Sequence, residues 1–216
     1  MTRGTGATRS ALAASLAGRA QASSILRRQF YARPTLTVAR DLIGARLVRI
    51  SNGRRLAGLI TETEAYIGEQ DLGCHATAGR TKRTEVMYGP PGHAYVYFTY
   101  GNHWMLNVVT EREGFPAAVL IRAIQPVDGV LTIARRRNHR DTYGPGKLTQ
   151  GLGISNVENG VDLTDPNSKL RIEFGWRVAD LAVTRGPRVG LNTVPEPWKS
   201  RPWRFLVDGW NLDTGE

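Results

Sequence analysis

Two glutamates separated by one residue are the first candidates for chemistry in this sequence. Glu62 and Glu64 lie in the run Thr-Glu-Thr-Glu-Ala-Tyr, which ends at Tyr66. Alternate side chains of a β-strand point to the same face, so both carboxylates would share one face. One hypothesis is a general base aimed into a cleft, because a carboxylate within hydrogen-bonding reach of water can activate it. The alternative is an edge strand with a solvated acidic face.

A metal site is a looser interpretation of the same region. Asp71 and His75 follow in the next segment, and with Glu64 they would supply three ligands. No His-x-x-x-His or His-x-His pair accompanies them, and Cys74 is the only cysteine of the chain. A lone cysteine excludes an intramolecular disulfide and zinc or iron–sulfur sites built from several thiolates. We therefore expect no metal, no cofactor and a reducing, intracellular setting.

An aromatic run forms the second unusual segment. Residues 93–104 read His-Ala-Tyr-Val-Tyr-Phe-Thr-Tyr-Gly-Asn-His-Trp. On a strand, Tyr95 and Tyr97 would share one face, and Phe98 and Tyr100 would share the other. Such a strand is either an ordinary sheet element, because Tyr and Phe are good strand formers, or a stacking surface for nucleic-acid bases. The residues alone leave both interpretations open.

Basic residues near these motifs indicate an anionic partner. Arg80, Lys82 and Arg83 lie in one loop of a chain with 29 Lys+Arg and 19 Asp+Glu, which favours nucleic acid, although such a loop alone is more often a solvated face. The run Gly-Pro-Gly-Lys, ending at Lys147, opens a short helical pattern and could present backbone N–H groups and a lysine to phosphate. The alternative is a plain turn and helix start. The Walker pattern is absent, so nucleotide hydrolysis is unsupported.

Short strands and short helices must position these side chains. The pattern predicts a helix at about 35–43, a hairpin at 45–66 around Asn52-Gly53 and a long loop at 67–92. Three strands follow at 93–100, 103–110 and 117–124, then helices at 127–139 and 146–153 and a last strand at 203–207. Clustered strands with isolated helices predict an α+β fold, a compact single domain with a central, mostly antiparallel β-sheet and surrounding short helices.

Charge and hydropathy divide the chain unevenly. Residues 1–29 hold five arginines and no acid in an Ala, Gly, Ser and Thr background, which predicts a disordered basic tail before a folded domain at 30–216. A transit peptide or a secretory signal is a weaker interpretation of the same segment. The longest apolar run, Ala117 to Ile121, is far shorter than the roughly 20 residues that cross a bilayer, so no membrane partner is expected.

Five sequence blocks in this order resemble the alkyladenine (3-methyladenine) DNA glycosylases of the methylpurine type. The blocks are ITETEAYIGEQDLGCHATAGRTKRTEVMYGPPGHAYVYFTYGNHWMLNVV, AAVLIRAIQP, GPGKLTQGLGI, RVGL and KSRPWRFLV. The likeness covers about residues 30–207. It implies a compact α+β domain, acting as a monomer on damaged purines in double-stranded DNA, inside the cell with that DNA.

The resemblance also implies site residues, position by position. Glu64 matches the general base that activates the attacking water, and Arg122 matches an arginine that supports the water and the carboxylate. The residues that match the walls and floor of the base pocket are Tyr66, His75, Tyr97 and Asn107. Tyr100 matches a tyrosine that wedges into the DNA, but Asn102 stands where a bulky apolar side chain often lies beside that wedge.

The implied reaction is flipping of an alkylated or deaminated purine and hydrolysis of its N-glycosidic bond. An alkylated purine is positively charged and leaves readily, and aromatic rings attract it. The TEAY and YVYxxYG blocks contain no lysine for a Schiff base, so the expected enzyme is monofunctional. Two rivals remain: a metal-dependent nuclease using Glu62, Glu64 and Asp71, and a passive nucleic-acid-binding module, since the family fold resembles the carboxy-terminal domain of a tRNA formyltransferase.

Overall fold

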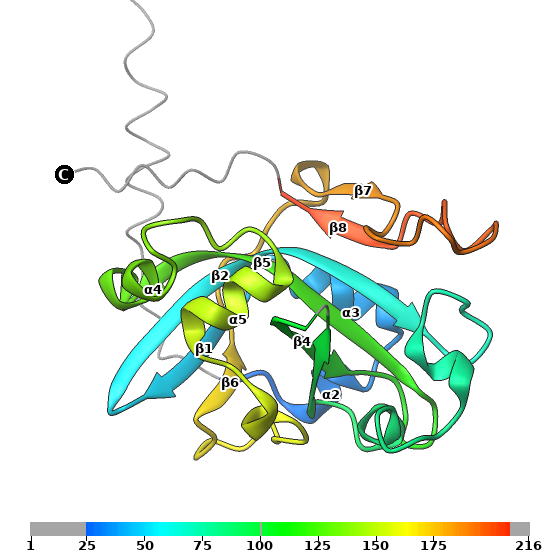
Figure 1. The fold of residues 1–216 in the computed structure, drawn as a ribbon, viewed down its shortest axis with the longest axis horizontal. Helices are drawn as coiled ribbons and strands as arrows, with labels where there is room; N and C mark the ends of the chain where they lie inside the picture. The colour runs from blue at the N-terminus through cyan, green and yellow to red at the C-terminus, as the bar shows by residue number, and fades with distance from the viewer. Residues whose placement is uncertain (1–24, 100, 208–216) are drawn as a thin grey trace, which may run out of the picture.

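An antiparallel sheet of eight strands frames the molecule (Figure 1). Six strands run in the spatial order β3-β4-β5-β2-β1-β6, while β8 pairs with both β2 and β7. The strands are β1 (Arg46–Ser51), β2 (Arg54–Ile67), β3 (Ala94–Thr99), β4 (His103–Val109), β5 (Ala117–Asp128), β6 (Leu170–Glu173), β7 (Thr184–Gly186) and β8 (Arg204–Leu206). The computed structural model describes residues 25–99 and 101–207. The predicted α+β class with a mostly antiparallel sheet is confirmed.

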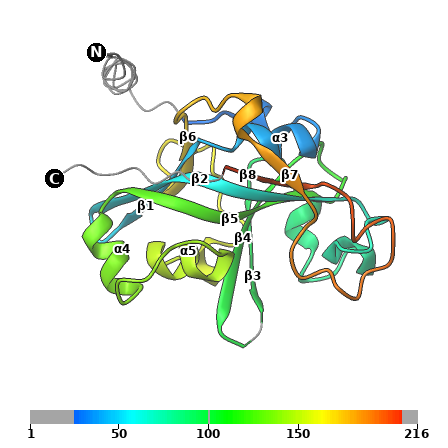
Figure 2. The same ribbon diagram turned by 90° about the horizontal axis from the view of Figure 1, so that it is seen from above.

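Local sequence explains the hairpin between β1 and β2. Asn52 and Gly53 both have positive φ, 51° and 72°, the conformation that a tight turn between right-twisted strands requires. This turn joins β1 to β2, as predicted. The β3–β4 hairpin projects from the rest of the molecule (Figure 2), and β5 continues the predicted meander beside it.

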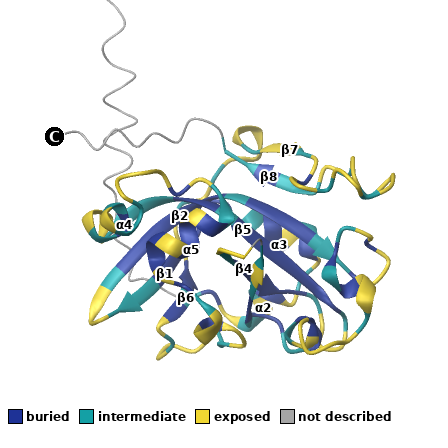
Figure 3. Cartoon of the chain, viewed as in Figure 1, coloured by how far each residue is buried: buried dark blue, intermediate teal, exposed yellow. Residues whose placement is uncertain are grey.

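Short helices cover the sheet on both sides (Figure 2). Helix α3 (Thr35–Asp41) lies on one side, and α4 (Val130–Arg136) and α5 (Pro145–Leu152) lie on the other. Four 3-10 helices and one further short α-helix complete the described elements: α2 (Arg28–Tyr31), η1 (His75–Ala78), η2 (Glu85–Tyr88), η3 (Asn156–Glu158) and η4 (Asp180–Ala182). Buried Val38 of α3 and Leu148 of α5 belong to one hydrophobic core, which Figure 3 shows as the dark blue centre of the sheet.

The predicted helix at 127–139 begins later than expected, because β5 extends to Asp128. Pro126 and Asp128 still pair with β2, opposite Gly58 and Ala57. The helix starts only after Gly129, whose φ of 65° turns the chain out of the strand. The long loop predicted at 67–92 is confirmed in outline, with η1 and η2 as its only helical turns among the described residues.

The folded domain begins before the predicted boundary at residue 30. Ile25 bridges to Glu173, and the backbone N–H of Leu26, which is 1% exposed, donates to the carbonyl of Ile172 at 2.9 Å. Arg28 forms an ion pair with Asp162 at 2.5 Å. Residues 25–29 therefore pack onto the sheet, since apolar side chains at 25 and 26 follow the basic stretch. The rest of the predicted tail lies outside the described residues.

None of the helices in the described ranges is long and apolar enough to cross a membrane.

Candidate active site

Glu64 is a fully buried carboxylate in the middle of β2, with a side chain that is 0% exposed. Its Oε2 accepts a hydrogen bond from the Tyr66 hydroxyl at 2.8 Å, and its Oε1 accepts one from the backbone N–H of Val189 at 2.7 Å. The Nε of Arg122 lies 3.3 Å from the same Oε1. Two hydrogen-bond donors and one guanidinium, from three segments, therefore converge on one carboxylate.

Burial and these donors have opposite effects on the pKa of Glu64. Desolvation raises the pKa of this carboxyl, while Arg122, the Val189 amide and the Tyr66 hydroxyl lower it, and the outcome is a pKa above the ordinary value. Tyr66 has a pKa raised well above its ordinary value, first by burial and then by Glu64, so its hydroxyl stays a donor. A carboxylate with a raised pKa is a stronger base than an exposed one.

Arg122 reaches the two glutamates from an irregularity in β5. The pairing with β2 passes from Ala123, opposite Glu62, directly to Ile121, opposite Thr63, and Arg122 is left without a Cα partner. Such bulges often re-aim a side chain next to a functional site.

Glu62 and Glu64 lie on the same side, as predicted, because both bind Arg122. The Nε of Arg122 is 2.9 Å from Glu62 and 3.3 Å from Glu64. Glu62 also binds Arg204 at 3.2 Å. Because Glu62 is paired with two arginines, it balances their charge and does not offer a second base. The alternative of an edge strand with a solvated acidic face is therefore excluded.

A cavity of about 420 Å³ lies beside this carboxylate. The residues predicted for the site that line it are Tyr66, His75, Tyr97, Asn107, Arg122 and Lys147. Glu64 lies behind the lining, bonded to three of the lining residues. The structure thus brings together residues from β2, η1, β3, β4, β5 and α5.

Aromatic rings form one wall of the cavity. The rings of His75 and Tyr97 meet edge to face with centroids 4.5 Å apart, and Tyr95 lies 5.3 Å from Tyr97. The Nδ1 of His75 is 3.1 Å from the Tyr95 hydroxyl. Burial, with a smaller effect from Arg83, lowers the pKa of His75, so this ring is neutral at pH 7. The sequence placed Tyr95 on the same face as Tyr97 but did not single it out as a site residue.

Asn107 fixes a polar group in the same cavity. This residue lies in β4, where it pairs with Tyr95 of β3, and it is 3% exposed. Its side-chain Nδ2 donates a hydrogen bond to the Tyr95 carbonyl at 3.1 Å. A buried amide with a fixed orientation presents a defined polar edge to whatever fills the cavity.

The four basic residues predicted to contact a DNA backbone divide into two groups. Lys147 lines the cavity and pairs with Asp141 at 3.0 Å, and the guanidinium of Arg83 lies 5.0 Å from the centre of the Tyr97 ring. Arg80 and Lys82 are exposed and do not line the cavity. Tyr100 lies outside the described residues, directly after Thr99, which does line the cavity.

The segment at 188–191 is the part of the site that the sequence patterns did not assign. Val189, Gly190 and Leu191 line the cavity, and the Val189 amide binds Glu64. The RVGL block was visible only as part of the family resemblance. Nothing in its residue types indicates a donor to a carboxylate, because the donor is a backbone group.

The metal hypothesis built on Glu64, Asp71 and His75 is not supported by the geometry. Both carboxylate oxygens of Asp71 bind Arg188, at 2.6 and 2.7 Å. Within residues 25–99 and 101–207, no group of three or more His, Cys, Asp or Glu could hold a metal ion.

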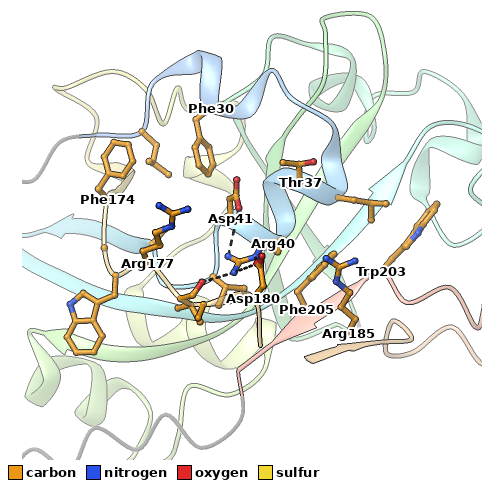
Figure 4. A pocket seen from close by; sticks show the side chains of 18 of the residues that line it. Phe30, Thr37, Arg40, Asp41, Phe174, Arg177, Asp180, Arg185, Trp203 and Phe205 are labelled. Atoms are coloured by element: carbon orange, nitrogen blue, oxygen red, sulfur yellow. Dashed lines mark hydrogen bonds and ion pairs between the residues drawn. The ribbon is translucent and has the colours of Figure 1, made fainter. Parts of the chain in front are cut away.

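A second cavity, of about 920 Å³, lies among α2, α3, the 174–180 segment, β7 and β8 (Figure 4). Phe30, Phe174 and Trp203 are among its lining side chains, and Arg40 binds Asp180 at its edge at 2.5 Å. It contains none of the site residues predicted from the sequence. The chemistry-bearing side chains therefore gather at the smaller cavity.

The chain is similar to the proteins of one known family. A family model described as methylpurine-DNA glycosylase (MPG) matches residues 29–211. A protein of Myxococcus xanthus is 49% identical over 178 residues, which are 82% of this chain and 87% of that protein. A protein of Carboxydothermus hydrogenoformans is 50% identical over 187 residues, 85% of this chain and 95% of its own length. Both bear the name "Putative 3-methyladenine DNA glycosylase".

Proposed function

The chain belongs to the methylpurine-DNA glycosylase family and is a DNA N-glycosylase, and from this premise we propose how it acts. It flips an alkylated or deaminated purine out of double-stranded DNA into the 420 Å³ cavity and hydrolyses the N-glycosidic bond with a water activated by Glu64. Its substrates are purines of the 3-methyladenine, 7-methylguanine, hypoxanthine and ethenoadenine class. The enzyme works as a monomer and leaves an abasic site.

The observation that carries this proposal is the position of Glu64 behind an aromatic cavity. A buried carboxylate held by Tyr66, Arg122 and the Val189 amide is fixed in place before substrate arrives. Such preorganisation is what places a base within reach of a reacting atom. Arg122 keeps the carboxylate ionised and helps to orient the water.

The walls of the cavity suit a flipped purine. His75, Tyr97 and Tyr66 offer ring faces and edges to a base, and aromatic faces attract a positively charged alkylated purine by cation–π interaction. Asn107 presents its amide at the floor and opposes the exocyclic amine of guanine. Flipping costs a few kcal/mol, least for lesions that pair poorly, which adds selectivity before the chemical step. Tyr100 fills the gap left in the duplex.

The reaction is a hydrolysis at C1′ of the deoxyribose. As the N-glycosidic bond breaks, its electron pair goes to the purine, and the sugar becomes oxocarbenium-like. The water oxygen forms the new bond to C1′, and Glu64 accepts the proton that this water loses. The negative carboxylate also stabilises the positive sugar, so one group serves both purposes.

Cleavage of the DNA strand is not part of this mechanism. Lys147 is the lysine that lines the cavity, and its ammonium is held in an ion pair with Asp141. A Schiff base needs an amine that is free to attack C1′, and this amine is bound by a carboxylate. We therefore assign Lys147, with Arg80, Lys82 and Arg83, to phosphate contacts.

The test is base release under single-turnover conditions from two duplexes, one with hypoxanthine and one treated with a methylating agent, in the presence of EDTA. We expect release of a purine from at least one duplex and strand breakage only after alkali. Loss of activity with EDTA would favour the metal-dependent nuclease, and strand breakage without alkali would contradict the monofunctional mechanism.

A further inference from the structure

A buried ion pair joins two loops on either side of the candidate active site. Arg188 and Asp71 are 117 positions apart, and both side chains are 0% exposed. The pair is bidentate, with Nη1 to Oδ2 at 2.6 Å and Nη2 to Oδ1 at 2.7 Å. Neither residue lines the cavity. Because a buried ion pair is weak evidence for stability, its presence here raises the question of what it positions.

On the Arg188 side, the ion pair fixes a donor to Glu64. Val189 follows Arg188 directly, and its backbone N–H donates to Oε1 of Glu64 at 2.7 Å. The guanidinium also donates to the carbonyl of Ala65 at 3.1 Å and lies 4.7 Å from the centre of the Tyr66 ring. Arg188 therefore contacts the two residues that follow Glu64 on β2 and holds the amide that binds Glu64.

On the Asp71 side, the pair fixes the turn that leads to the cavity wall. The Asp71 carboxylate accepts from the backbone N–H of Ile67 at 3.1 Å and of Gly73 at 3.0 Å. The Asp71 carbonyl accepts from the N–H of Cys74 at 2.8 Å, and His75 begins η1. The aromatic wall is thus tied through Asp71 to the same guanidinium.

The two loops approach each other closely at Gly73. A Cβ at this position would lie 2.8 Å from Nη2 of Arg188 and 2.7 Å from Cδ1 of Leu191. The glycine lets the 71–75 turn and the 188–191 segment meet across the cavity.

We propose that Arg188, held by Asp71, is a positioning residue for the glycosylase reaction: it keeps the Val189 amide on Glu64 and the His75 wall in place opposite it. This inference rests on the proposed role of Glu64 as the base. Arg188 does not line the cavity and touches no reacting atom, so it acts through Glu64 and the His75 wall.

A positioning role of Arg188 should change the pH dependence of base release, which a purely structural role would leave unchanged. The Val189 amide favours the ionised form of Glu64, so its displacement raises the pKa of Glu64 further. The other charged or titratable groups that face Glu64 are Glu62 and Tyr66 of β2, Arg122 of β5 and Arg204 of β8. Of these, Tyr66 is in contact with Arg188, and a lysine at position 188 keeps the positive charge near its ring. A shift of the acidic limb of the pH–rate profile to higher pH therefore indicates that the Val189 amide has been displaced from Glu64.

The experiment compares Arg188→Lys with wild type and with the control Arg185→Lys. Lysine keeps the charge but lacks the planar fork, so it cannot form the bidentate pair. Arg185 is exposed, three positions earlier, and its guanidinium lies over Phe205 at the other cavity. We expect R188K to lose about 10-fold to 100-fold in single-turnover base release at pH 7, with the affinity for lesion DNA nearly unchanged and the acidic limb moved to higher pH. R185K should match wild type.

Wild-type rate and pH profile in folded R188K would overturn the inference, as would a loss of affinity without a loss of rate. If R188K does not fold, Val189→Pro removes the amide donor and leaves the ion pair, and the same shift of the acidic limb is expected; an unchanged profile overturns the inference. Glu64→Gln distinguishes a failure of the proposed function from a failure of the role of Arg188. Wild-type activity in E64Q would refute the proposed function, whereas an inactive E64Q with a normal R188K would refute only the role of Arg188.

Discussion

In the proposed mechanism, Glu64 has to be buried close to the reacting sugar and yet ionised when the water arrives. Its three polar partners, the Tyr66 hydroxyl, the Arg122 guanidinium and the Val189 amide, each stabilise the charged form. Desolvation nevertheless dominates and raises the pKa above its ordinary value. The side chain is therefore a stronger base than an exposed glutamate, at the cost of a narrower pH range in which it works.

The raised pKa of Glu64 predicts the acidic limb of the pH–rate profile. Only the ionised carboxylate can accept the proton of water, so single-turnover base release should fall as pH is lowered through this pKa. The midpoint should lie above 4.5, the ordinary value for glutamate. Binding of lesion DNA, measured over the same pH range, is the control for loss of affinity. A midpoint at or below the ordinary value would show that Glu64 is not the titrating base.

At the scale of elements, the pairing of β2 with β5 positions Glu64 and Arg122 relative to each other. Glu64 pairs with Leu120, and the irregularity around Arg122 lets that side chain reach both glutamates. The backbone N–H of Gly144 donates to the carbonyl of Arg122 at 2.9 Å, which ties the start of α5 to the same point. Displacement of β2 against β5 should therefore affect both stability and activity.

Gly58 allows this close contact between β2 and β5, and Gly58→Ala tests it. An added Cβ would lie 2.8 Å from Cδ1 of Ile124, closer than side chains tolerate. We expect a loss of about 1 to 3 kcal/mol in the free energy of unfolding, measured by urea denaturation. Gly186→Ala is the matched control, because its Cβ would have its nearest neighbour, Arg204, at 3.8 Å. Equal stability of the two variants would contradict the contact.

Local sequence patterns predicted most helices and strands, but they could not predict contacts between residues far apart in the chain. Asn52-Gly53 specified the hairpin, and the alternation in β2 placed Glu62 and Glu64 on one side. The continuation of β5 to Asp128 was missed, because pairing with β2 overrides the helical pattern that starts at 127. The partnership of Arg188 with Asp71 could not be predicted, since no local pattern links residues 117 positions apart.

At the scale of the whole molecule, net charge defines how the enzyme meets its substrate. The formal net charge is +10, and the exposed cations of the 80–83 loop follow η1, which carries the His75 wall of the cavity. Positive charge attracts the DNA backbone and releases its counterions, so affinity should depend on salt. Charge favoured nucleic acid as the partner, and the family resemblance specified double-stranded DNA, while the boundary of the domain had to come from the packing of residues 25–29.

Binding to duplex DNA should fall linearly in a plot of log affinity against log salt concentration. Lys82→Ala removes one exposed cation and should reduce the slope by about one if it contacts a phosphate. Arg54→Ala, at the exposed start of β2, is the matched control and should leave the slope unchanged. A wild-type slope near zero would refute the electrostatic contribution, and an unchanged slope in Lys82→Ala would refute the assignment of that residue.

The measurement that tests the central claim most directly is single-turnover base release by Glu64→Gln, together with its affinity for the same lesion duplex. Glutamine keeps the shape of the side chain but cannot accept the proton of water. We predict a rate at least about 100-fold below that of wild type with lesion binding retained. Release at the wild-type rate by this variant would contradict the account, because the attacking water would then not depend on Glu64.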